Sequence, residues 1–72
     1  MADTIEVNIG RLPGQVLPFN MPSGATVQDA LNTAELDVGS NEVRVNGDLV
    51  EDVNRILDEG DRVTLVGRIK GN

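Results

Sequence analysis

The chain has 72 residues, with twelve Asp and Glu against six Lys and Arg, so its formal net charge is −6 at neutral pH. This length supports one small domain, because a second hydrophobic core would need far more chain. The absence of Cys and His excludes disulfides, thiolate zinc sites and cysteine nucleophiles, and it removes the commonest general base and metal ligand. We therefore expect no enzyme activity, no metal and no cofactor.

The acidic charge also argues against nucleic acid and anionic membranes as partners, because both are polyanions that attract cationic surfaces. No stretch approaches the roughly 20 apolar residues that a membrane-spanning helix needs. The first residues contain neither the basic region nor the apolar run of a signal peptide. We expect a cytoplasmic protein whose partner is another protein.

The acidic residues are unevenly distributed. Six of them lie between Asp48 and Asp61, where Arg55 is the only base, whereas residues 62–72 contain three bases and no acid. Such an acidic run is typical of a solvated surface, and it would also suit a docking face for a basic partner.

Period-2 alternation of apolar and polar side chains predicts a hairpin in the first third of the chain. Residues 5–9 and residues 17–21 both alternate in this way, and we expect Phe19, the single aromatic residue, in the core. Residues 10–14 contain two glycines and a proline, which predicts a five-residue loop. Pro18 lies within the second strand and has no N–H, so we expect it at a sheet edge or a bulge.

A helix of two to three turns is predicted next. Thr26 is a good N-cap residue, and Asp29 stands three residues later, which is close to a capping box. Apolar residues between positions 27 and 34 recur at i, i+3, i+4 and i+7 and give the helix one buried face. In the connection that follows, we expect Leu36 and Val38 to pack against the core.

The second half of the chain predicts three further strands. Residues 43–45 alternate again, and Asn46-Gly47 follows, a dipeptide that accepts the positive φ angles of a type I′ turn. Residues 48–50 form the short return strand, and residues 63–66 form the last strand. Residues 51–59 carry apolar side chains at i, i+3 and i+4, which predicts a helical turn or a short 3₁₀ segment beneath the sheet.

The order strand–strand–helix–strand–short strand–strand predicts an α+β fold, because a helix that follows a hairpin must cover one face of the sheet. The last strand can lie beside the first as a parallel neighbour, and the β-grasp is then the simplest topology. We expect a mixed four- to five-stranded sheet with one main helix packed on one face. Residues 1–66 would form a single β-grasp domain and residues 67–72 a flexible C-terminal tail.

Three motifs resemble the ubiquitin-like sulfur carriers of the ThiS/MoaD type, in order, with fitting spacings and over nearly the whole chain. They are Gly24-Ala25-Thr26-Val27, Val45-Asn46-Gly47-Asp48-Leu49-Val50 and Leu57-Asp58-Glu59-Gly60-Asp61-Arg62-Val63. The resemblance implies a β-grasp fold and an activity located at the C-terminus. These carriers end in Gly-Gly, whose carboxylate is adenylated by an activating enzyme and then converted to a thiocarboxylate or joined to a lysine.

This chain departs from that pattern at its end. It reads Lys70-Gly71-Asn72, so Gly71 matches the penultimate glycine, whereas Asn72 stands in place of the last one. In the carriers that this chain resembles, a glycine pair is needed because the tail threads a narrow channel whose walls any Cβ would meet.

The altered end favours a non-catalytic ubiquitin-like protein that acts as a protein-interaction module through its sheet face, an exposed strand edge or its C-terminal tail. The candidate site residues in the tail are Gly67, Arg68, Ile69, Lys70, Gly71 and Asn72. The alternative is a sulfur carrier or protein modifier that an adenylating enzyme activates at its C-terminus. A further alternative is a small structural subunit of a larger assembly.

Overall fold

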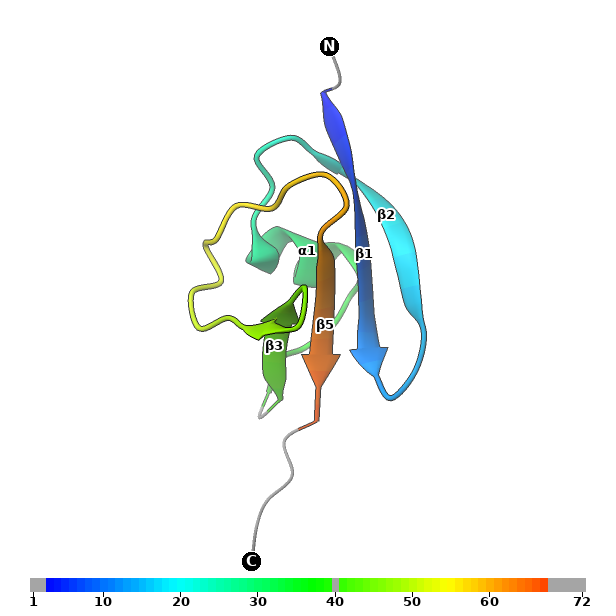
Figure 1. The fold of residues 1–72 in the computed structure, drawn as a ribbon, viewed down its shortest axis with the longest axis vertical. Helices are drawn as coiled ribbons and strands as arrows, with labels where there is room; N and C mark the ends of the chain where they lie inside the picture. The colour runs from blue at the N-terminus through cyan, green and yellow to red at the C-terminus, as the bar shows by residue number, and fades with distance from the viewer. Residues whose placement is uncertain (1–2, 40, 68–72) are drawn as a thin grey trace, which may run out of the picture.

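The computed structural model describes residues 3–39 and 41–67, which form a five-stranded mixed sheet with one helix on one of its faces (Figure 1). The strands are β1 (Thr4–Leu12), β2 (Val16–Pro22), β3 (Glu42–Val45), β4 (Asp48–Leu49) and β5 (Arg62–Val66), and the helix is α1 (Val27–Thr33). The strands lie in the order β2-β1-β5-β3-β4, with β1 and β5 parallel and the other neighbours antiparallel. The predicted α+β arrangement, with the last strand beside the first, is confirmed.

The core lies between α1 and the inner face of the sheet. Leu36 and Val38 from the connection after α1 pack against this core, as predicted, whereas Phe19, predicted to lie in the core, is only partly buried against it. Burying one large aliphatic side chain contributes about 1.5–3 kcal/mol, so packing holds a helix that is too short to be stable alone in water. The buried hydrophobic residues are Val7, Ile9, Met21, Ala25, Val27, Ala30, Leu31, Val43, Val45, Leu57, Val63 and Leu65.

The first hairpin is longer than predicted, because β1 continues to Leu12 and the connection to β2 covers only residues 13–15. Gly10 therefore lies inside a strand, opposite Val16, and not in a loop. A Cβ on Gly10 would be 2.1 Å from the carbonyl oxygen of Gln15. This glycine is required by the close approach of two backbones and not by a turn.

The predicted capping box at the start of α1 is confirmed. Thr26 Oγ1 accepts a hydrogen bond from Asp29 N at 3.2 Å, and Asp29 Oδ2 accepts one from Thr26 N at 3.0 Å. The helix ends at Thr33 with Ala34 as its C-cap, so its two turns agree with the predicted length.

The connection from β4 to β5 is irregular, and the helical turn predicted for it is wrong. Ile56 forms an isolated bridge with Thr26, and Leu57 is buried in the core. The carbonyl oxygens of Arg55 and Val53 accept hydrogen bonds from the first two backbone N–H groups of α1, at 3.0 and 2.9 Å. These donors have no partner within a helix, so the connection completes the N-terminus of α1. Its own backbone makes a single turn there, closed by a hydrogen bond from Arg55 N to Asp52 O at 3.2 Å.

The second hairpin has the predicted turn. Asn46 and Gly47 have φ angles of 54° and 90°, and Val45 pairs with Asp48 across the turn. Positive φ at both central residues is the requirement that Asn-Gly meets at low cost.

Candidate functional site

The end of β5 marks the start of the predicted binding tail. Gly67 follows Val66 directly, is exposed and lies beside Asn41, whose Oδ1 would be 3.8 Å from a Cβ on Gly67. Because β1 and β5 are parallel, the chain leaves the sheet at the same end as the β1–β2 hairpin (Figure 1). The remaining predicted tail residues, Arg68, Ile69, Lys70, Gly71 and Asn72, lie outside the described residues.

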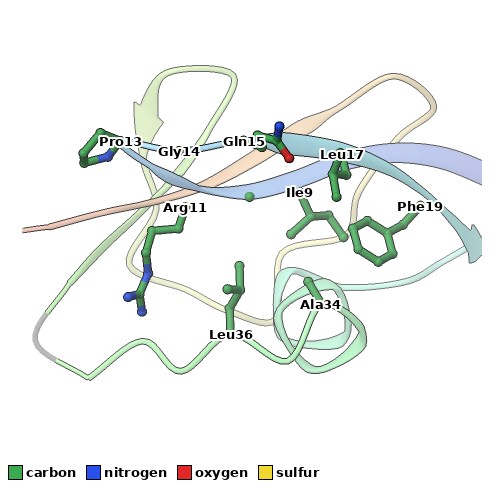
Figure 2. A pocket seen from close by; sticks show the side chains of 10 residues that line it. Ile9, Arg11, Pro13, Gly14, Gln15, Leu17, Phe19, Ala34 and Leu36 are labelled. Carbon is green, nitrogen blue, oxygen red and sulfur yellow. The ribbon is translucent and has the colours of Figure 1, made fainter.

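A pocket of about 350 Å³ opens between the β1–β2 hairpin and the C-terminal end of α1 (Figure 2). Its apolar lining comes from Ile9, Leu17, Phe19, Ala34 and Leu36, and Arg11 contributes a charge. In Figure 2, Leu36 points from the loop after α1 toward the sheet, and Arg11 points from β1 toward that loop. The pocket therefore has apolar walls on two sides and a guanidinium group between them.

The opposite side of the sheet, which faces away from α1, is not covered by any described element. The side chains on this side belong to alternate residues of β1, β3, β4 and β5. Those across its centre, which we call the open face, are Leu12, Glu42, Arg44, Leu49, Thr64 and Val66. Leu12 and Val66 are half-buried neighbours across β1 and β5, and Leu49 is 50% exposed. Leu12 and Val66 lie at the end of the sheet where the tail begins, whereas Leu49 lies in register with Arg44 and Thr64, farther from that end.

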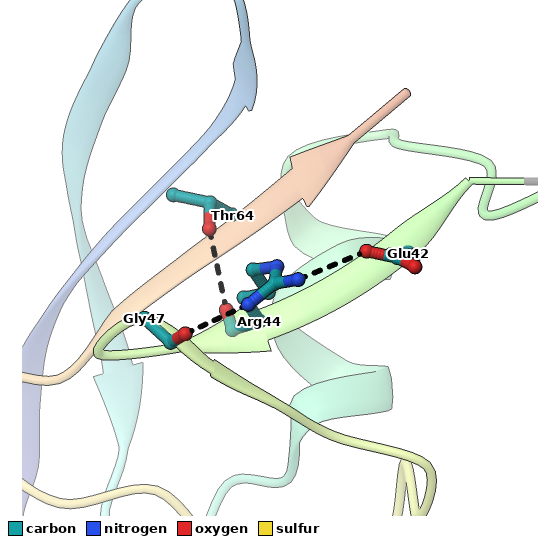
Figure 3. Close-up of polar contacts among 4 residues, drawn as sticks. All are labelled: Glu42, Arg44, Gly47 and Thr64. Atoms are coloured by element: carbon teal, nitrogen blue, oxygen red, sulfur yellow. Dashed lines mark hydrogen bonds and ion pairs between the residues drawn. The ribbon is translucent and has the colours of Figure 1, made fainter. Parts of the chain in front are cut away.

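Arg44 is held in one position on the open face (Figure 3). Its Nη1 donates to the carbonyl oxygen of Gly47 at 3.0 Å, and its Nη2 forms an ion pair with Glu42 Oε1 at 3.2 Å. Thr64 Oγ1 lies 3.5 Å from the carbonyl oxygen of Arg44, on the neighbouring strand. Because both terminal nitrogens of this guanidinium are already bonded, the side chain loses little conformational entropy when a partner covers it.

The two edges of the sheet offer few donors to an added strand. Asn8 N donates to Asp61 O at 2.9 Å, so the backbone groups of Asn8 point away from β2. Its partner Pro18 therefore makes no backbone hydrogen bond to β1, and its backbone groups point outward from the edge of the sheet. Pro22 lies four residues later and points the same way, and neither proline has an N–H to donate. On the other side, β4 is only two residues long. The predicted edge position of Pro18 is confirmed, and strand addition is poorly supported.

Two solved structures superpose on nearly all of this chain. One is a ubiquitin-like protein from Trypanosoma brucei, 18% identical, with a TM-score of 0.69 over 96% of this chain and 100% of that one. The fold is the ubiquitin-like β-grasp. The other is from the complex of subunits 1 and 2 of the molybdopterin-converting factor of Helicobacter pylori 26695, 18% identical, with a TM-score of 0.64 over 94% of this chain and 100% of that one. The sequence itself matches no protein-family model and no curated protein.

The acidic residues of this β-grasp have two kinds of environment. Asp52, Glu59 and Asp61 each accept a hydrogen bond from a backbone N–H, at 2.8 to 3.0 Å, and so hold the β4–β5 connection in place. The side chains of Asp48 and Glu51 are exposed. Half of the acidic run therefore has a structural role.

In the part of the β-grasp that the structure describes, a metal site would need a cluster of metal ligands, and a membrane span would need a long apolar helix. Within residues 3–39 and 41–67, no three or more acidic side chains come close enough together to hold a metal ion. Across the same residues, no helix has the length and apolar character needed to cross a membrane.

The pocket is the feature of the β-grasp that the sequence reading missed. Its residues come from β1, β2 and the loop after α1, and only the tertiary fold brings them together. One signal was available in β1, where Ile5, Val7 and Ile9 alternate inward and Arg11 occupies the next inward position. A charged residue that continues an apolar row indicates a site at the rim of the core.

Proposed function

We propose that this β-grasp chain is a non-catalytic protein-interaction module of the cytoplasm, whose domain, residues 1–66, binds a partner protein through the open face. The tail, residues 67–72, would extend the same binding surface. The observation that carries the proposal is the open face itself, with exposed Leu49 and half-buried Val66 on either side of Arg44.

The composition of the open face suits an interface. Protein-binding surfaces combine apolar side chains, which are buried when the partner binds, with Arg residues, whose hydrogen bonds orient the partner. The contacts that contribute most to affinity lie near the centre of the surface. Arg44 lies between the apolar residues and is already fixed by Gly47 and Glu42. Because β2 presents two outward prolines and β4 is short, side-chain contacts on the open face fit better than strand addition at an edge.

The start of the tail supports its inclusion in the same surface. Gly67 follows Val66 without a break, so a partner on the open face would meet the tail as well. Arg68 and Lys70 add two positive charges to it, in a chain that is acidic elsewhere. The molybdopterin-converting factor structure contains a complex of two subunits, which supports a protein as the kind of partner.

The test is affinity capture from the native host, with the full chain as bait. Leu49→Glu places a charge on the open face and should lower partner recovery at least tenfold. Ile56→Glu is the matched control, because Ile56 is 61% exposed and lies outside the open face. Thermal unfolding should show that both variants are folded. Equal recovery with both variants, or no reproducible partner, would refute the proposal.

A second candidate function is that of a sulfur carrier or protein modifier activated by an adenylating enzyme. It is favoured by the likeness to a chain of the molybdopterin-converting factor complex and by Gly71 near the end of the sequence. The intact mass of the protein from its native host tests it, because a thiocarboxylate or a conjugate changes that mass. Pyrophosphate release with ATP and the cognate activating enzyme gives a second readout. Release that appears only after Asn72→Gly would eliminate this candidate.

A further inference from the structure

We propose that the pocket beneath the β1–β2 hairpin binds a short acidic peptide segment of a partner protein. One large apolar side chain of that segment enters the pocket, and a neighbouring carboxylate pairs with Arg11. The pocket and the open face are on opposite sides of the sheet, so this site is independent of the proposed function.

The shape of the pocket fits a side chain better than a large ligand. Its volume of about 350 Å³ is near the lower end of the range for small-molecule sites, and it is open to solvent. Ile9 is 2% exposed and belongs to the core, whereas Leu17 is 51% exposed. Covering Leu17 and the half-buried ring of Phe19 removes apolar surface from water, which contributes roughly 25 cal/mol for each Å².

Arg11 determines which apolar segment is preferred. Among the described residues that line the pocket, it is the only ionisable one. In residues 3–39 and 41–67 its guanidinium has no hydrogen bond or ion pair, in contrast to that of Arg44. An unpaired guanidinium beside an apolar wall is complementary to a carboxylate next to an apolar side chain.

The surroundings of the pocket restrict where the carboxylate can lie. Glu35 and Asp37 are exposed and bracket Leu36 on the loop that forms the far wall. Because Arg11 also points toward this loop (Figure 2), they disfavour a carboxylate close to the loop, and the carboxylate of the segment is expected to reach Arg11 from the solvent side. Pro18 and Pro22 limit backbone pairing along β2, so the segment is held by its side chains.

The probe is a fluorescein-labelled, end-capped hexapeptide, Gly-Asp-Leu-Phe-Asp-Gly, titrated with the full chain at low salt and followed by fluorescence anisotropy. Amide NMR with the unlabelled peptide locates the site. We expect saturable binding and shifts of the amides of Arg11, Gln15, Leu17 and Leu36. Shifts confined to other residues, or no saturable binding at millimolar protein, would overturn the proposal.

Matched variants separate the charge from the apolar contact. Arg11→Gln should weaken binding about fivefold, as expected for a partly exposed ion pair, and Arg55→Gln should leave it unchanged. Leu17→Asn should also weaken binding, whereas Ile56→Asn, at a site that is 61% exposed, should not. A peptide with Asn in place of both Asp should bind wild type and Arg11→Gln equally. If Arg55→Gln and Ile56→Asn weakened peptide binding as much as Arg11→Gln and Leu17→Asn do, the proposed site would be refuted.

Two other occupants are distinguished by the same measurements. If the pocket amides shift when the protein is concentrated without peptide, the occupant is a second copy of this chain. If decanoate binds there and the peptide does not, the occupant is a small amphiphile. Either result would overturn the assignment to a peptide segment.

Discussion

Asn46 and Asp61 join two turns at one end of the sheet, because Asn46 Nδ2 donates to Asp61 Oδ1 at 2.9 Å across 15 residues of sequence. The other half of the carboxamide, Asn46 Oδ1, accepts a hydrogen bond from Arg62 N at 3.1 Å. Asp61 Oδ2 in turn accepts one from Asp58 N at 2.8 Å. Asn46 therefore does more than tolerate a positive φ: it ties the β3–β4 turn to the turn before β5.

Two variants of Asn46 should separate these roles. Asn46→Gly keeps the positive φ and loses both side-chain bonds, so we expect it to lower the free energy of unfolding by about 1–2 kcal/mol. Asn46→Ala must also adopt a φ of 54°, which adds roughly 1 kcal/mol. Urea unfolding measures both values. Equal and small losses would show that the side-chain bonds contribute little.

Gly10→Ala should be among the most destabilising small substitutions in this chain. Its Cβ would be 2.1 Å from Gln15 O, so the hairpin must open locally, at a cost of about 3 kcal/mol. Gly67→Ala is the matched control, because its Cβ would meet Asn41 Oδ1 only at 3.8 Å. Urea unfolding should place the control within about 0.5 kcal/mol of wild type. Similar midpoints for the two variants would contradict this geometry.

Thr26→Ala removes the acceptor for Asp29 N and should cost about 1 kcal/mol. Thr26→Ser keeps the hydroxyl and should recover most of that loss. Thr33→Ala, at the exposed last position of α1, is the control and should change stability by less than about 0.5 kcal/mol. Thermal unfolding of the three variants checks the order, and a Ser variant as unstable as the Ala variant would argue against the cap.

The outward prolines of β2 should keep this edge from pairing with another copy. Pro18→Thr combined with Pro22→Thr restores two outward N–H groups, so we expect self-association that rises with protein concentration. Size-exclusion chromatography with light scattering measures it. Asn20→Thr, which adds no N–H to the same edge, should remain like wild type. A double variant with unchanged molar mass would show that the prolines are not needed for this purpose.

Local signals predicted the elements whose residues interact with near neighbours. The Thr26–Asp29 box and the Asn46-Gly47 turn depend on residues at most three positions apart, and both appear as predicted. The strand alternation also predicted the buried side chains of β1, β3 and β5, whereas in β2 only Met21 is fully buried and Leu17 is 51% exposed. The topology followed from the order of these elements.

The errors arose where distant residues determine the local backbone. The spacing of apolar residues in the β4–β5 connection suggested a helical turn, yet the carbonyls of Val53 and Arg55 bond to α1. The glycines and proline of residues 10–14 predict a loop that includes Gly10, whereas Gly10 is required by the close approach of Gln15. The pocket was missed for the same reason, since no segment of sequence contains both Arg11 and Leu36 with their neighbours.

The bonds from α1 to the β4–β5 connection have a consequence for folding. The amides of Val27 and Gln28 gain their acceptors from residues more than twenty positions later, so the first turn of α1 is complete only once the C-terminal half is in place. Helix ends usually fray and exchange their amide hydrogens readily, but these two should exchange as slowly as the central strands. We therefore expect α1 and the β4–β5 connection to open together, although 24 or more residues separate them in the sequence.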